Sequence, residues 1–283
     1  MKQSVLQMLT CFTKDFKNIE KIITCMAIEI KRKFPSKKTG RRRTAFTNVL
    51  AGIFYRCKSG CPWRSLPRIF GAYTTIHRWF MVFVQEKIFE KLWQALLNGL
   101  AGQGALNCKR LLFDGSLIQC ASANEYAIYN PRRGKRCINR LVACNSQRIP
   151  LALLYARGTA NDTQFLVPLL EKISCKKGFH VHADKGFDSL TNRMAVTARG
   201  GFPHIPVRNH GYAKDVPCPT EKDVHRPRVE HAFAWINNFR SLKYITDRRS
   251  DVIFQSTCIA FAIICSRFLK PRSTNWSLLC KNF

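Results

Sequence analysis

Acidic residues are scarce in this chain of 283 residues, which has 17 Asp and Glu against 47 Lys and Arg and a formal net charge of +30. So large a positive charge says little about the fold, but it predicts a polyanionic partner. Nucleic acid is the first candidate for that partner, and an anionic membrane surface is the alternative. The scarcity of acids also makes any Asp or Glu within an apolar stretch conspicuous.

The sequence has no apolar run as long as a membrane span requires. Its longest uncharged apolar run, 252–266, has 15 residues, whereas a transmembrane helix needs about 20. We therefore expect 252–266 to form a buried helix, and we expect no membrane partner. The N-terminal residues also lack the pattern of a secretory signal peptide.

The 13 cysteines follow no paired pattern. The closest pair is Cys57 and Cys61, and no second pair of cysteines or histidines lies at the spacing of a zinc finger. A zinc site is therefore weakly supported. Because secretion is also disfavoured, we expect reduced thiols in a cytoplasm.

One acid does lie inside an apolar run. Asp114 is preceded by 111–113 (Leu-Leu-Phe) and followed closely by 117–118 (Leu-Ile), a pattern that predicts a buried strand. A carboxylate in such a place is costly unless something pairs with it. Asp114 is either part of a tight turn with Gly115 and Ser116, or a metal-ligating carboxylate in the middle of a sheet.

The first 43 residues are expected to form a helical extension that ends in a basic arm. Segment 31–43 holds eight basic residues among thirteen. A solvated charge run is the ordinary explanation. Contact with phosphates is an equal alternative in so basic a chain, and the candidate DNA contacts in this arm are Arg41, Arg42 and Arg43.

Residues 44–104 are expected to form a separate helical domain. Apolar residues at helical spacing predict helices near 46–54 and over 74–97, and a turn-rich loop, 59–71, lies between them. This arrangement suits a helix-turn-helix-like DNA-binding domain, although a plain helical packing domain has the same pattern. The Gly- and Ala-rich segment 97–104 marks the boundary.

Residues 105–270 are expected to form a mixed sheet covered by helices, before a tail at 271–283. A hairpin comes first and strands then alternate with helices, which is the order of a ribonuclease H-like α/β domain with a five-stranded sheet. The predicted strands are 109–119, 135–145, 150–157, 179–184 and 202–207, and the predicted helices are 161–175, 188–198 and 228–243.

Two further acids fall where this topology would bring them to Asp114. Asp184 ends the fourth predicted strand, and Glu230 lies in the first turn of the last predicted helix. Three converging carboxylates raise one another's pKa values, and oxygen-preferring divalent cations such as Mg²⁺ or Mn²⁺ remove that conflict. Two such ions about 3.5–4 Å apart support in-line phosphoryl transfer. The alternatives are a strand-end turn for Asp184 and a helix-dipole role for Glu230.

Other candidate ligands have simpler explanations. Asp162 and Asp188 lie where each could cap a helix. His180 and His182 alternate along one strand face, and core packing or substrate contact explains them better than zinc does. No nucleophile elbow supports serine or cysteine catalysis.

With these motifs in view, the chain resembles bacterial insertion-sequence transposases of the insertion sequence 5 family, which carry an Asp-Asp-Glu triad. The resemblance covers roughly 44–268 and rests on four stretches. They are Gly60-Cys-Pro-Trp-Arg-Ser-Leu-Pro67 with Phe70-Gly71, Phe113-Asp114-Gly-Ser, Ala183-Asp184-Lys-Gly-Phe-Asp188, and Arg226-x3-Glu230 followed by Ala232-Phe-Ala-Trp235 and Phe239-Arg240.

The resemblance implies roles for individual residues. Asp114, Asp184 and Glu230 would be the catalytic ligands of two Mg²⁺ or Mn²⁺ ions. Arg226 matches a family arginine that contacts DNA, and the matched motifs add Arg240, Trp63 and Arg64 as candidate DNA contacts. The sequence departs from the family pattern at Asn237, which replaces a basic residue, at Asp223, which replaces a tyrosine, and at 132–136, an altered approach to the second strand.

The resemblance implies a DNA transposase that cleaves at terminal inverted repeats and joins the freed 3′-hydroxyl to target DNA. We expect a homodimer, because two ends must be joined, and a nucleoid-associated protein of the bacterial cytoplasm. A structure-specific nuclease on the same fold would cut without joining. A decayed DNA-binding protein would bind end sequences without responding to metal.

Overall fold

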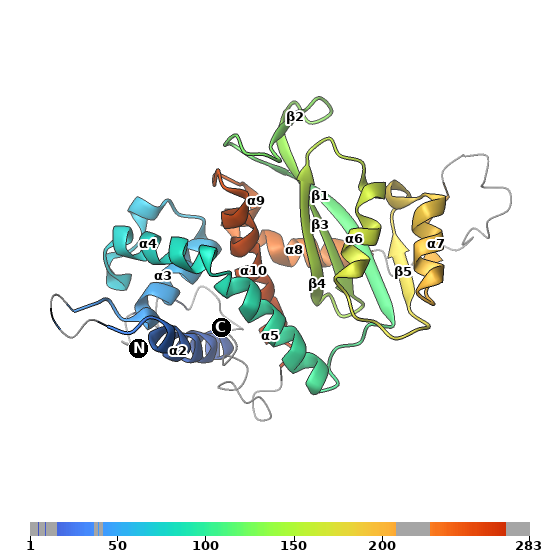
Figure 1. The fold of residues 1–283 in the computed structure, drawn as a ribbon. Helices are drawn as coiled ribbons and strands as arrows, with labels where there is room; N and C mark the ends of the chain where they lie inside the picture. The colour runs from blue at the N-terminus through green and yellow to red at the C-terminus, as the bar shows by residue number, and fades with distance from the viewer. Residues whose placement is uncertain are drawn as a thin grey trace. The chain divides into compact units, whose positions relative to one another are not determined.

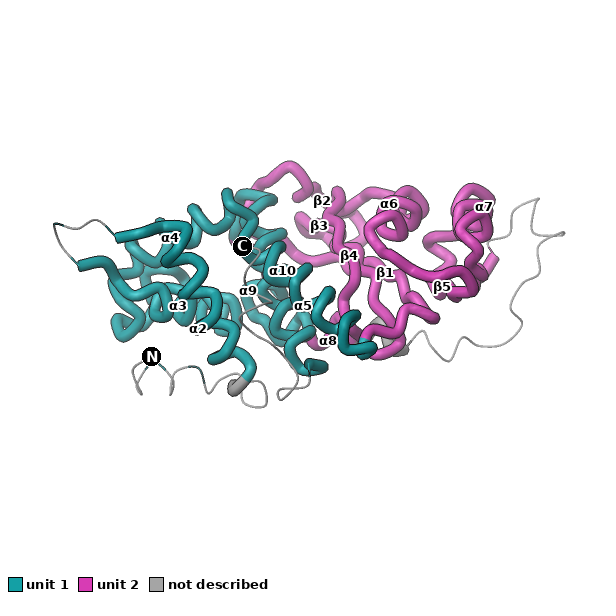
Figure 2. Tube along the Cα trace, turned by 60° about the horizontal axis from the view of Figure 1, so that its bottom comes forward, with its two compact units in different colours: residues 1–105, 236–243, 247–283 teal, residues 106–235, 244–246 magenta. Residues whose placement is uncertain are grey.

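The computed structural model describes residues 5, 9, 16–36, 39, 42–207 and 227–269, without the side chains of 16, 17 and 227–231 (Figure 1). The chain divides into two compact units (Figure 2). Unit 1 comprises the described residues of 1–105, 236–243 and 247–269, and unit 2 comprises the described residues of 106–235 and 244–246.

Unit 1 is built of helices. They are α2 (Phe16–Lys33), α3 (Phe46–Ser59), α4 (Tyr73–Gln85), α5 (Ile88–Gly102), α9 (Arg240–Lys243) and α10 (Ser250–Ser266), with short 3₁₀ turns η2 (Trp63–Ser65) and η3 (Arg68–Phe70). The stretch 74–97, expected to be helical, forms two helices, α4 and α5, because the chain breaks at Lys87. That residue adopts φ 54°, a left-handed conformation that no helix interior tolerates.

The apolar run 252–266 lies in α10, which is buried along most of its length, as its composition predicts. It packs against α5, where the Trp93 and Phe261 rings meet edge to face with centroids 5.0 Å apart. Residues 236–243 and 247–269 therefore group with the helices of unit 1 rather than with the sheet that precedes them. None of the helices in the described part of the chain is both long and apolar enough to cross a membrane.

Unit 2 is built on a mixed sheet, as the order of its elements predicts. Its described residues hold six strands rather than the five expected, in the order β2-β3-β1-β5-β6 with β4 also on β3. The extra strand, β2, has only three residues, too few for a periodic pattern. The strands are β1 (Arg110–Gln119), β2 (Ile128–Asn130), β3 (Lys135–Asn145), β4 (Pro150–Arg157), β5 (His180–Ala183) and β6 (Phe202–His204).

Strand β1 lies in the middle of the sheet and joins its antiparallel and parallel halves. It pairs antiparallel with β3, and β3 pairs antiparallel with β4 and β2. On its other side β1 pairs parallel with β5, which pairs parallel with β6. Leu111, Leu112 and Phe113 are at most 1% exposed, so the strand that carries Asp114 is anchored in the core.

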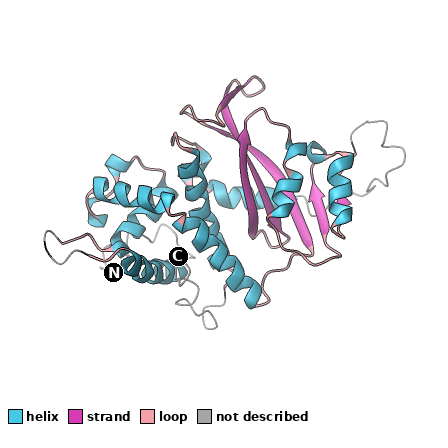
Figure 3. Ribbon diagram, in the orientation of Figure 1, coloured by secondary structure: helices cyan, strands magenta, loops and turns pink. Residues whose placement is uncertain are grey.

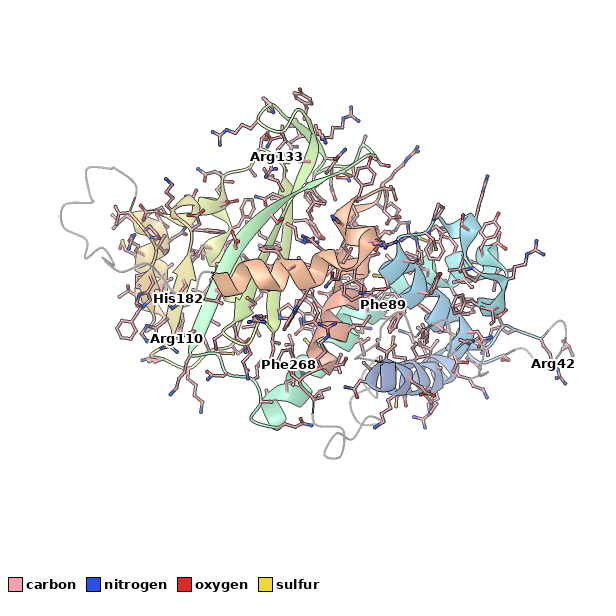
Figure 4. All side chains as sticks on the ribbon, turned by 180° about the vertical axis from the view of Figure 1, so that it is seen from behind. Arg42, Phe89, Arg110, Arg133, His182 and Phe268 are labelled. Atoms are coloured by element: carbon pink, nitrogen blue, oxygen red, sulfur yellow. The ribbon has the colours of Figure 1, made fainter. Side chains whose placement is uncertain are left out.

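Helices lie on both faces of this sheet. In Figure 3, α6 (Leu166–Glu171) and α7 (Leu190–Ala198) lie in front of the strands. Seen from the opposite side, α8 (Pro227–Asn237) crosses the other face (Figure 4). Two expected helices are shorter than predicted: the one over 161–175 ends at Glu171, and the one over 228–243 is interrupted after Asn237.

Candidate active site on the sheet

Asp114 and Asp184 lie side by side where the β1–β5 ladder ends. Phe113 and Ala183 form the last pair of that parallel ladder, so Asp114 and Asp184 are the next residues on neighbouring strands. Neighbouring strands are about 4.8 Å apart. Asp184 keeps an extended backbone, with φ −70° and ψ 159°, so the alternation of side chains continues and both acids fall on one face of the sheet.

Backbone amides orient both carboxylates. The Gly115 N–H donates to Asp114 Oδ1 at 2.8 Å, and the Lys185 N–H donates to Asp184 Oδ1 at 2.6 Å. Asp184 is also the N-cap of the 3₁₀ turn η5 (Lys185–Phe187). Asp184 is therefore a strand-end turn residue, as one alternative expected, and at the same time a neighbour of Asp114.

Helix α8 covers the sheet face that carries the two acids. Asp114 pairs with Val142 in β3, and Arg140, two residues before Val142, therefore lies on the same face. The Arg140 guanidinium carbon is 5.6 Å from the centroid of the Phe233 ring on α8. Glu230 lies in α8 one turn before Phe233, but its side chain lies outside the described part of the structure.

Arg140 is a buried cation that the sequence analysis missed. Its side chain is fully buried, and burial lowers its pKa, while a hydrogen bond with Tyr155 opposes that shift. Tyr155 is its direct partner in β4. The sequence feature that could have identified Arg140 is a charged residue within the apolar run of β3. The same feature singled out Asp114 in β1.

Two family models match this chain. Residues 109–264, more than half of the chain, match the family described as "Transposase DDE domain", and 29–93 match "Putative transposase of IS4/5 family". The chain belongs to the DDE transposase family. Membership implies a divalent metal cofactor in general terms.

A curated relative supports the same family assignment. The chain is 27% identical over 138 residues to the "Putative transposase for insertion sequence element IS402" of Burkholderia cepacia. That match spans 46% of this chain and 63% of the relative's length. A piggyBac transposase synaptic complex with hairpin DNA aligns over 98% of this chain and 78% of its own, at 12% identity and a TM-score of 0.45. At that TM-score the likeness does not by itself establish a shared fold.

Some of the residues singled out from the sequence lie outside the described part of the structure. They are the predicted DNA contacts Arg41 and Arg226, and Asp223. Arg42, Arg64 and Arg240 are exposed on unit 1.

Arg43 and Trp63, also predicted to contact DNA, make packing contacts within unit 1. The Arg43 guanidinium lies 4.1 Å from the Phe46 ring centroid and donates to the Phe34 carbonyl at 2.7 Å. Trp63 stacks under the Arg56 guanidinium at 4.6 Å and also contacts the His77 ring. Each has a structural role that explains its residue type.

The other acids and the histidines of unit 2 hold local structure. Asn161 caps η4 (Asp162–Gln164), whereas Asp162 accepts a hydrogen bond from Asn139 Nδ2 at 2.7 Å. Asp188 is buried against Arg193 at 2.9 Å. Among the described side chains, no group of three His, Cys, Asp or Glu is placed to hold a metal ion.

Proposed function

We propose that this chain is a DNA transposase, which cleaves DNA at terminal inverted repeats and transfers the freed 3′-hydroxyl to target DNA. Its membership of the DDE family and the adjacent placement of Asp114 and Asp184 support this proposal. The order of strands and helices in unit 2 also supports the finer assignment of a ribonuclease H-like fold. The net charge of +30 supports binding of a polyanion across a site that is itself acidic.

The donor set fits a divalent metal. Carboxylate oxygens suit Mg²⁺ and Mn²⁺, and Asp114 and Asp184 present theirs from neighbouring strands on one sheet face. We propose Glu230 of α8 as the third ligand, from its position one turn before Phe233. When bound at these residues, two such ions would supply activation of the attacking oxygen and stabilisation of the leaving oxygen for an in-line displacement.

The residues of this chain would supply positioning and charge. The amides of Gly115 and Lys185 hold one oxygen of each Asp in place, so the ligands are pre-oriented before substrate arrives. We propose that unit 1 binds the DNA ends as a helix-turn-helix-like module, with phosphate contacts from Arg42, Arg64 and Arg240. Arg41, Arg43, Arg226 and Trp63 remain proposed contacts.

The partners follow from the reaction. The substrates would be two terminal inverted repeats and a target duplex, and we propose a homodimer because two ends must be cut and joined together. The protein would work in the bacterial cytoplasm, in association with the nucleoid.

The test is Mg²⁺-dependent cleavage and joining of DNA that carries the element's ends, using Asp114→Asn, Asp184→Asn and Glu230→Gln. Each substitution removes a metal-ligating charge and keeps the side-chain shape. A matched control is Glu171→Gln, since Glu171 lies at the end of α6 with its side chain 59% exposed. The three variants should lose both reactions and the control should keep them. Cleavage by the variants at the parent rate would overturn the proposal, and cutting without joining by the parent would indicate a nuclease.

A further inference from the structure

The sheet face that carries Asp114 and Asp184 also carries a column of aromatic rings. The Phe202 and His180 rings stack with centroids 5.1 Å apart, and His180 and His204 are tilted at the same separation. The His182 and His204 rings stack at 4.6 Å with an interplanar angle of 9°. The phosphoryl transfer proposed above uses none of these rings.

The strand register arranges the residues of this face in rows that run across β1, β5 and β6, with one residue from each strand in a row. His180 pairs with Arg110 on one side and with Phe202 on the other. The next row holds Leu112, His182 and His204, and the acids follow it. Arg110 and His182 are labelled in Figure 4, on the sheet face that α8 crosses.

The outer row is open to solvent. Phe202 is 55% exposed although it is a large apolar side chain. Arg110 is exposed and His180 half-buried. His180 Nδ1 and His204 Nε2 are 2.8 Å apart, and that hydrogen bond fixes the imidazole against which Phe202 stacks. The row thus presents a braced aromatic surface with a cation at its end.

This combination is the chemistry that recognises an unpaired nucleotide. Exposed aromatic rings stack on bases whatever the sequence, and a nearby cation takes the phosphate. Arg110 lies four residues before Asp114, or about 13 Å along the strand. That distance spans a few nucleotides, because B-form DNA rises about 3.4 Å per nucleotide.

We propose that Arg110, His180 and Phe202 form a subsite for an unpaired nucleotide of the DNA substrate, a few nucleotides from the scissile phosphate. The base stacks on Phe202, which His180 supports, and the phosphate contacts Arg110. This subsite rests on the proposed function, because it needs DNA on the acidic face. The positive charge of Arg110, in the same row as Phe202 but across His180 from it, favours DNA over a protein partner as the occupant.

The experiment measures binding of a short single-stranded oligonucleotide that carries 2-aminopurine, whose fluorescence falls when it stacks. The full chain is used in the presence of a chelator at several salt concentrations. Phe202→Ala should weaken binding about five- to hundredfold, abolish the stacking signal and leave the salt slope unchanged. Arg110→Ala should instead make the salt slope shallower by about 0.7, the value of one phosphate contact on a single strand.

Two variants act as controls. Phe202→Trp keeps a ring and should bind as the parent does. Met194→Ala removes a side chain that is 62% exposed on α7, which lies on the other face of the sheet, and should change neither affinity nor fluorescence.

Parent-like affinity and fluorescence in Phe202→Ala would overturn the subsite. So would a change in oligomeric state on its substitution, which would make the row a protein interface. This assay contains no metal and measures no cleavage, whereas the triad variants are tested by cleavage. The result for the subsite is therefore independent of the result for the triad.

Discussion

The carboxylate of Asp162 lies 3.2 Å from the position that a Cβ atom on Gly115 would occupy. The same carboxylate lies 3.3 Å from the corresponding position on Gly186. Gly115 directly follows Asp114, and Gly186 follows Asp184 by two residues. One side chain on the opposite sheet face therefore packs against the backbone beside both proposed metal ligands, and glycine at these two positions permits that approach.

Gly115→Ala should disturb this packing. A Cβ at this position would also meet Asn139 Oδ1 at 3.1 Å, so the strand or Asp162 must shift, at a cost of about 1–3 kcal/mol. We expect a lower free energy of unfolding in urea and weaker Mn²⁺ binding. The control is Gly102→Ala, where a Cβ meets nothing within 4 Å; if both variants behaved alike, the packing argument would be wrong.

Asp162→Ala should destabilise unit 2 by removing a hydrogen-bond acceptor. Asn139 is only 4% exposed and donates to Asp162 Oδ1 at 2.7 Å. Leaving a buried amide without its acceptor costs about 1–3 kcal/mol. Asp162→Asn keeps an oxygen at that place and should lose less in the same urea measurement. Equal stability of Asp162→Ala and the parent would contradict this assignment.

Asp247→Ala should destabilise unit 1 much more than the loss of a surface ion pair. Arg56 is 7% exposed, donates to Asp247 Oδ1 at 3.1 Å and stacks on Trp63. Removing one partner of a buried pair costs about 3–5 kcal/mol.

The matched surface pair is Arg249 and Asp251, whose side chains are 51% and 46% exposed. Asp251→Ala should change the free energy of unfolding by less than about 1 kcal/mol. If Asp247→Ala and Asp251→Ala lowered the free energy of unfolding by similar amounts, burial would not strengthen the Arg56–Asp247 pair, and the prediction would be wrong.

The buried thiols should make stability fall at alkaline pH. Burial raises the pKa of Cys57 from its ordinary 9.0 to about 11, and that of Cys144 to about 12. The folded state therefore keeps protons that the unfolded state releases above pH 9, so each thiol's contribution is complete below pH 9. That contribution to the free energy of unfolding is lost as the pH rises from 9 toward the pKa of the folded thiol. The loss is up to about 1.4 kcal/mol per pH unit for each thiol.

Cys57→Ala should remove its share of this slope. Urea unfolding at pH 8, 9 and 10 measures the difference between the variant and the parent, so groups common to both cancel. An identical pH dependence in the two proteins would contradict the raised pKa of Cys57.

Much of unit 2 was predictable because its strands are long or strongly apolar. The run around Asp114 and the hairpin 135–157 carry clear patterns. Three features could not be predicted. Strand β2 is too short for periodicity, and the break at Lys87 depends on a backbone conformation that Lys rarely adopts. The grouping of α10 with α5 depends on the chain returning to unit 1, which local sequence does not encode.

Asp114 and Asp184 were singled out because carboxylates are rare in this chain and these two stood at predicted strand positions. Arg140 was missed because arginine is common in this chain, and the stacking of Trp63 on Arg56 was not predictable from the sequence. Sequence identifies unusual residue types, whereas burial and stacking come from contacts distant along the chain.

The central claim is that Asp114 and Asp184 together hold a divalent cation. Its most direct test is a Mn²⁺ titration of the full chain, in which electron paramagnetic resonance counts the free ion. The parent and Glu171→Gln should bind Mn²⁺ alike, and Asp114→Asn and Asp184→Asn should each weaken binding at least about tenfold. Undiminished Mn²⁺ binding in both Asp variants would contradict the claim.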